Sequence, residues 1–138
     1  MPVVQHILET SLEVSDLERS EVFYRRLFNF STVMATDRMR VLSIRDREVL
    51  LLFVRGKSAA GELTPGGFIP GHNASGQMHV AFAVQLADMT EWRKKLEANG
   101  IAIESFTNPP KGGESLYFRD PDQHLIELAT PAIWGFES

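Results

Sequence analysis

Three side chains of this sequence have the types and spacing that suit metal chemistry: Glu9, His79 and Glu127. Glu9 and His79 lie in stretches that alternate between apolar and polar residues, as half-buried strands do, and Glu127 lies in the strand expected at 124–130. In each stretch it falls on the face opposite the apolar residues that would pack on a helix, so it is available to line a pocket. Taken alone, a strand Glu is usually just exposed, and a lone His is usually a hydrogen-bonded structural residue. The combination matters more than any one member.

Two carboxylates and one imidazole are ligands that suit a divalent ion such as Mn²⁺, Fe²⁺, Ni²⁺ or Zn²⁺. Three protein ligands leave coordination positions open for water and substrate, which is the pattern of a catalytic site. The sequence therefore predicts that Glu9, His79 and Glu127 bind one divalent metal.

The elements that must position these residues follow one order twice. In the first half, alternation over residues 6–14 predicts a strand. Ser15 then opens a capping box with Glu18, in which the two side chains satisfy N–H groups of the first helical turn. The helix should end near Asn29, and three strands are expected at 30–34, 40–44 and 49–54.

In the second half, residues 78–84 alternate as a strand, and Asp88 opens another capping box. Asn99-Gly100 ends the helix, and strands are expected at 101–106, 115–119 and 124–130. Residues 55–77, rich in Gly and Pro, predict a linker or lid rather than a core element.

This repeat predicts an α+β fold of two tandem βαβββ modules, residues 6–54 and 78–130, within a single domain of residues 1–138. One module has too little core to stand alone, so the two should share a cupped mixed sheet. The repeat places Glu9 and His79 at matching positions of the opening strands. It places Leu51 and Glu127 at matching positions of the closing strands.

Composition excludes several classes of function. The chain has no Cys, which rules out disulfides and thiolate metal sites and is compatible with a cytoplasmic protein. Its net charge is -4 with scattered Lys and Arg, so nucleic-acid binding is not expected. The N-terminus lacks the pattern of a signal peptide. The longest apolar run, Val49–Val54, is far short of the ~20 residues that span a bilayer.

Three segments resemble signatures of the vicinal oxygen chelate superfamily, which includes glyoxalase I, bleomycin-resistance proteins and extradiol dioxygenases. They are LETSLEVSDLERSEVFY at 8–24, HVAFAV at 79–84 and LYFRDPDQHLIEL at 116–128. The resemblance covers nearly the whole chain apart from residues 55–77. It implies a metal-dependent enzyme of lyase or dioxygenase type that chelates vicinal oxygens of a small substrate. It also implies a homodimer.

Carried over onto this sequence, Glu9, His79 and Glu127 take three of the family's four ligand positions, and Leu51 takes the fourth. Glyoxalase I has a Glu there that takes part in proton transfer, so Leu51 disfavours that activity. Extradiol dioxygenases resemble this chain in lacking a ligand at that position, but they use two His and one Glu, and here the first His is replaced by Glu9.

Further catalytic candidates are Glu127 itself, Tyr117 and His72. Extradiol enzymes keep a Tyr on the strand of Tyr117 as an acid or hydrogen-bond donor, and the alternative is a Tyr packed at the rim. His72 could act as acid or base over the pocket, or lie exposed in its loop. His124 is expected to be a turn residue, and Arg119 to pair with a neighbouring Asp.

A second hypothesis is a binding protein of the bleomycin-resistance type, which holds a drug or other small molecule and carries no metal. Three aligned metal-binding side chains favour the enzyme, although a vestigial site would have the same pattern. The metal content of the purified protein separates the two hypotheses.

Overall fold

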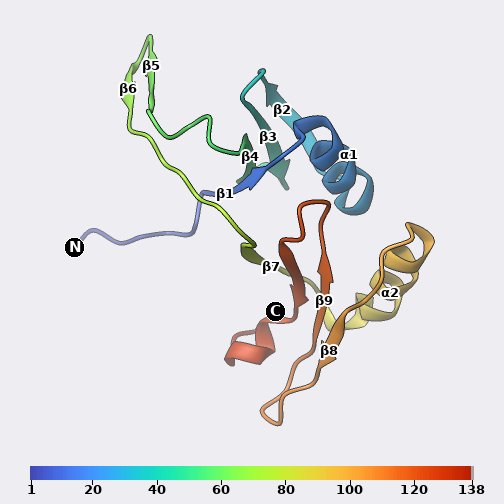
Figure 1. Cartoon of the computed structure of the whole chain (residues 1–138). Coiled ribbons are helices and arrows are strands. Elements are labelled where there is room, and N and C mark those ends of the chain that lie inside the picture. Colours follow the sequence, from blue (N-terminus) through green and yellow to red (C-terminus); the bar gives the residue numbers. More distant parts are fainter. Residues whose placement is uncertain (138) are drawn as a thin grey trace. The chain divides into compact units, whose positions relative to one another are not determined.

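The computed structural model describes residues 1–137, and the chain divides into two compact units, with the boundary between Gly76 and Gln77. Each unit contains one four-stranded sheet and one α-helix (Figure 1). No helix within the described residues is long and apolar enough to cross a membrane.

The first unit holds the elements of the first repeat. They are β1 (Glu9–Val14), α1 (Leu17–Phe28), β2 (Ser31–Ala35), β3 (Met39–Ile44) and β4 (Glu48–Val54). The strand order is β1-β4-β3-β2. The opening strand β1 lies parallel to the closing strand β4, and the other neighbours are antiparallel.

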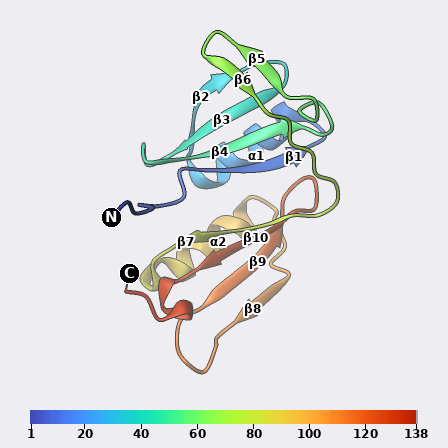
Figure 2. The same cartoon turned by 90° about the vertical axis from the view of Figure 1, so that its left-hand side faces the viewer.

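The second unit repeats this plan. Its elements are β7 (His79–Ala83), the short 3-10 helix η1 (Leu86–Asp88), α2 (Met89–Ala98), β8 (Ser105–Thr107), β9 (Ser115–Arg119), β10 (Leu125–Ala129) and the 3-10 helix η2 (Pro131–Trp134). The strand order β7-β10-β9-β8 matches that of the first unit, with β7 parallel to β10. Figure 2 shows each helix behind the sheet of its own unit.

The predicted α+β fold with two βαβββ modules is therefore confirmed, with differences at the element ends. The opening strand begins at Glu9 rather than at residue 6. The strand expected at 101–106 is the shorter β8, which begins at Ser105. Residues 55–77 are more than a linker, because they contain the hairpin of β5 (Glu62–Thr64) and β6 (Gly67–Ile69).

The helix caps differ from the expectation. Asp16, not Ser15, caps α1, because its carboxylate accepts the backbone N–H of Arg19 at 3.0 Å. The Ser15 hydroxyl instead accepts a hydrogen bond from the Arg19 side chain. Asp88 makes no side-chain cap bond to α2, since η1 runs directly into that helix.

Each sheet buries one face under its helix. In the first unit α1 packs on β3 and β4, and its buried residues recur at helical spacing: Leu17, Ser20, Tyr24 and Leu27. The alternate strand positions that complete the core are Leu12, Leu42, Leu50 and Leu52 in the first unit, and Leu116, Phe118, Ile126 and Leu128 in the second. The other face of each sheet carries the polar residues named as candidates.

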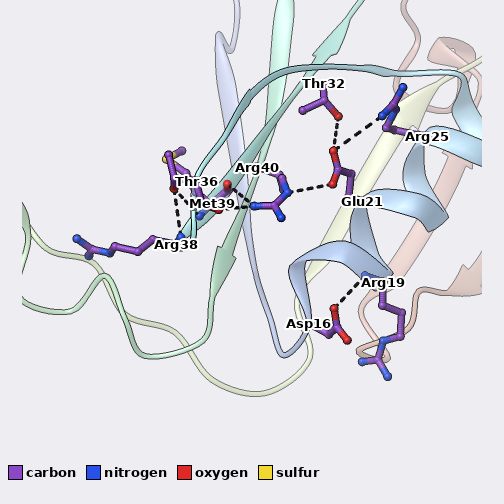
Figure 3. A network of polar contacts seen from close by, with 9 residues as sticks. All are labelled: Asp16, Arg19, Glu21, Arg25, Thr32, Thr36, Arg38, Met39 and Arg40. Carbon is purple, nitrogen blue, oxygen red and sulfur yellow. Dashed lines mark hydrogen bonds and ion pairs between the residues drawn. The ribbon is translucent and has the colours of Figure 1, made fainter.

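A polar network also ties α1 to its sheet (Figure 3). The Glu21 carboxylate accepts hydrogen bonds from the Thr32 hydroxyl at 2.5 Å and from Nε of Arg40 at 2.9 Å, and Arg25 lies 4.0 Å away. Burial opposes ionisation of Glu21, but the two hydrogen bonds and the positive charges of Arg40 and Arg25 together hold its pKa below the usual value. The helix is thereby held to β2 and β3 by charge as well as by packing.

Candidate metal centre

His79, Glu127 and Tyr117 lie on one face of the second sheet, as their parity predicts. In the register of the sheet, Glu127 is directly opposite Tyr117 on β9 and Ala81 on β7. His79 is two residues before Ala81, so it shares that face. Three of the candidate residues are thus brought together within one unit.

The imidazole of His79 is held from both sides. Its Nδ1 lies 2.9 Å from the backbone carbonyl oxygen of Leu125, and its Nε2 lies 3.1 Å from Oε1 of Glu127. A carbonyl can only accept, so Nδ1 carries a hydrogen, and Nε2 is the nitrogen directed at the carboxylate. Orientation of the ring by a backbone carbonyl is the arrangement that metal-ligating His residues use.

Nε2 and Oε1 are both atoms that bind cations. At 3.1 Å the two atoms are close enough for one cation to contact both. The pair therefore fits two adjacent positions of a metal centre.

Sequence reasoning missed Ser115, which belongs to the same cluster. Its hydroxyl donates to Oε2 of Glu127 at 2.6 Å, and its residue is 1% exposed. The carboxylate of Glu127, itself 6% exposed, thus has a separate partner for each oxygen. The parity of Ser115 with Tyr117 in β9 was the signal that could have identified it.

Small residues line part of this face, which also carries Leu125 and Arg119. Ala81 and Ala83 follow His79 along β7, and Ala129 follows Glu127 along β10, where it pairs with Ala83. The side chain of His79 is 49% exposed. The imidazole of His79 is therefore accessible to a ligand.

Glu9 and Leu51 belong to the first unit, and the register supports their repeat relation to the pair above. Leu51 lies opposite Ser11, two residues after Glu9, just as Glu127 lies opposite Ala81, two residues after His79. Glu9 is exposed, and Leu51 is buried. Glu9 thus occupies the position of His79 in its own unit, and an alkyl chain occupies the position of Glu127.

Neither unit by itself gathers three His, Asp or Glu side chains into a metal cluster, among the residues that the structure describes. The complete ligand set of Glu9, His79 and Glu127 stays a prediction. Two of its members, His79 and Glu127, lie next to each other in the structure.

His72 lies in the first unit beside a buried carboxylate. Its Nδ1 is 3.5 Å from Oε1 of Glu13, and its ring meets that of Phe53 edge-on at 4.5 Å between centroids. Glu13 is 3% exposed, while the His72 side chain is 44% exposed. His72 is therefore a loop residue with an exposed side chain that still contacts Phe53 and Glu13, and its role as acid or base stays a prediction.

Two minor expectations were wrong. Arg119 pairs with Glu104, not with a neighbouring Asp, through two hydrogen bonds of 3.0 Å that lower the pKa of the Glu104 carboxyl. His124 is not an ordinary turn residue, because it is fully buried and its Nδ1 accepts the backbone N–H of Met78 at 2.9 Å. This bond fixes the residue that precedes His79.

Comparison with known proteins gives consistent matches. Metallothiol transferase FosB of Bacillus licheniformis is 26% identical over 132 residues, which are 95% of this chain and 77% of that protein. Catechol-2,3-dioxygenase of Bacillus subtilis is 32% identical over 126 residues, which are 89% of this chain but 40% of that longer protein.

Among solved structures, a protein described as lactoylglutathione lyase from Agrobacterium tumefaciens superposes with a TM-score of 0.87 at 32% identity, covering 96% of this chain and 98% of that one. A family model matches residues 4–128, which is nearly the whole chain and includes Glu9, His79 and Glu127. The resemblance seen in the sequence is thereby confirmed: this chain belongs to the Glyoxalase/Bleomycin resistance protein/Dioxygenase superfamily.

Proposed function

We propose that this protein is a metal-dependent enzyme in which Glu9, His79 and Glu127 hold one divalent ion, of Fe, Mn, Ni or Zn, that chelates two vicinal oxygens of a small substrate. The observation that carries the proposal is the pairing of His79 Nε2 with Oε1 of Glu127 at 3.1 Å, with the other ring nitrogen oriented by a backbone carbonyl.

The bound ion would act as a Lewis acid that stabilises negative charge developing on the substrate oxygens. Side chains of the protein would bind the substrate and transfer protons. The small side chains that follow His79 along β7 would leave room for substrate, and Tyr117, directly opposite Glu127, would donate a hydrogen bond to it. His72 remains a candidate acid or base.

The relatives support metal-assisted chemistry without agreeing on one reaction. Their names describe a metallothiol transferase, a catechol dioxygenase and a lactoylglutathione lyase. Lyase, transferase and oxygenase reactions therefore all remain candidates. Leu51, at the position matching Glu127, is the residue of this chain that bears on the choice.

The second candidate is a metal-free protein that binds a small molecule or drug. The observation that favours it is that neither unit, within the described residues, supplies three metal ligands by itself. The absence of Cys is compatible with a cytoplasmic location for either function.

The deciding experiment is elemental analysis of the protein purified without added metal, followed by titration of the metal-free protein with Mn²⁺ and Zn²⁺. If the protein is the proposed enzyme, about one ion should bind tightly per protein chain. Absence of binding at millimolar metal, in a folded protein, would contradict the enzyme and leave the small-molecule binder.

A further inference from the structure

Ser115 is a buried polar residue that the fold itself does not require. In the sheet it pairs with Ala129. The matching pair in the first unit is Met39 with Phe53, so the repeat needs no hydroxyl at this position. The only described partner of its hydroxyl is the Glu127 carboxylate, at 2.6 Å. A function connected with Glu127 would explain a serine here.

The backbone around Ser115 is clamped on the side that precedes the strand. The N–H of Glu114 donates to the Thr130 hydroxyl at 3.0 Å, and the N–H of Thr130 donates to the carbonyl of Glu114 at 3.0 Å. Gly113 lies so close to Ile133 that a Cβ there would be 2.7 Å from its side chain. The position of the Ser115 hydroxyl is therefore set by rigid surroundings.

The Ser115 hydroxyl binds one carboxylate oxygen of Glu127 and leaves the other oxygen free to face His79 and the proposed metal. Oε2 accepts from Ser115, while Oε1 faces Nε2 of His79. Without the donor, the carboxylate could rotate about its terminal bond, which has a broad torsional preference. Desolvation of the buried carboxylate would also be compensated less well.

We propose that Ser115 is a positioning residue that holds Glu127 as a one-oxygen metal ligand through Oε1. This inference rests on the proposed function, since it assumes that Glu127 binds the metal. Removing a group that hydrogen-bonds to a metal ligand typically weakens metal binding by about 10- to 100-fold.

The test compares Ser115→Thr with Ser115→Val in the full-length chain, because these variants have similar shapes and differ in the hydroxyl. Ser115→Ala gives the simple deletion. Ser43→Ala is the control, since Ser43 is another buried strand serine, which bonds to Asp46 in the first unit. Mn²⁺ affinity is measured by calorimetric titration, and the spectrum of bound Mn²⁺ by electron paramagnetic resonance.

We expect Ser115→Val and Ser115→Ala to bind Mn²⁺ about 10- to 100-fold more weakly and with an altered spectrum. Ser115→Thr and Ser43→Ala should stay close to the unmodified protein in both readouts. Equal affinities and spectra for the Thr and Val variants would overturn the role of Ser115 while leaving the proposed function intact. Failure of the unmodified protein to bind Mn²⁺ or Zn²⁺ would overturn both.

Discussion

His79 is fixed by a carbonyl on one ring nitrogen and a carboxylate on the other, so the proposed metal centre depends on it directly. Changing His79 to Ala should reduce bound metal to background in elemental analysis, because a ligand is lost from a three-ligand set. His6→Ala is the matched control, since the described hydrogen bond of the His6 ring is to the carbonyl of the next residue. Full metal retention by the His79 variant would refute the assignment.

Leu51 is the second residue that bears on which reaction the protein catalyses. Its register position matches that of Glu127, and it has no group that could move a proton. We therefore expect weak or no turnover of the methylglyoxal–glutathione adduct by the natural sequence. Leu51→Glu should add a fourth ligand and tighten metal binding, provided that the longer side chain fits.

Metal titration and a glyoxalase assay on both proteins measure these effects. Robust glyoxalase activity of the unmodified protein would show that a carboxylate at position 51 is not needed for this reaction. The glyoxalase assay is chosen because the solved structure with a TM-score of 0.87 is described as a lactoylglutathione lyase.

At this scale the sequence predicted those residues whose placement follows from strand parity. His79, Glu127 and Tyr117 share a face because the period of a strand is two. Ser115, the Asp16 cap and the Glu104 partner of Arg119 were not predicted. Each depends on which of several nearby polar groups a side chain reaches, and spacing alone does not decide that.

The anchoring of the segment 55–77 belongs to the scale of elements. The carbonyl of Ser58 accepts the N–H of His72 at 2.9 Å, so the chain that carries the β5–β6 hairpin is closed at its base. The His72 ring then lies against Phe53 and beside the buried carboxylate of Glu13, both on strands of the first sheet.

We expect Glu13 and His72 to be energetically coupled. Removing His72 takes a cation-forming group from beside a buried carboxylate, and this should cost less when that carboxylate has already been made neutral. A double-mutant cycle of Glu13→Gln and His72→Ala, followed by urea unfolding, should give a coupling free energy of about 1 kcal/mol. Additive effects within ~0.3 kcal/mol would show that the 3.5 Å contact contributes nothing.

The Glu21 network predicts a pH dependence for the attachment of α1. The pKa of Glu21 is lowered in the folded protein, so its stabilising contribution is present above the pKa of the unfolded chain and is lost as pH falls through the folded value. Glu21→Gln should lower the free energy of unfolding by about 1 kcal/mol near neutral pH, with a smaller difference below about pH 4.

Denaturant unfolding of both proteins between pH 3 and 7 measures this difference. A difference that stays constant over the whole range would mean that the charge of Glu21 is not what holds α1 to β2 and β3.

Element order could be predicted because hydrophobic periodicity changes between strand and helix at each boundary, and it does so twice in the same order. The β5–β6 hairpin was not predicted, because Gly and Pro dominate its surroundings and its strands have three residues each. The observed ends of some strands also differ from the predicted ends by several residues. Pairing with a neighbour decides where a strand begins, and the residues of the strand alone do not.

At the scale of the whole molecule, we predict a homodimer. Each four-stranded sheet ends in two edge strands, which proteins generally cover, and large exposed apolar side chains are present, such as Leu63, Phe68 and Trp134. Light scattering at micromolar concentration should report about twice the chain mass of 15.5 kDa. A single species of one chain mass over that range would end this claim.

The pairing of the first strand of each unit with its last strand has a consequence for how the protein is made. During synthesis β1 has to wait for β4, and β7 has to wait for β10, before either sheet can close. His79 emerges from the ribosome early in the second unit, but its partner Glu127 lies on the last strand of that sheet. Translation must therefore pass β10 before His79 and Glu127 can meet, and a nascent chain that stops before β10 cannot assemble the proposed metal centre.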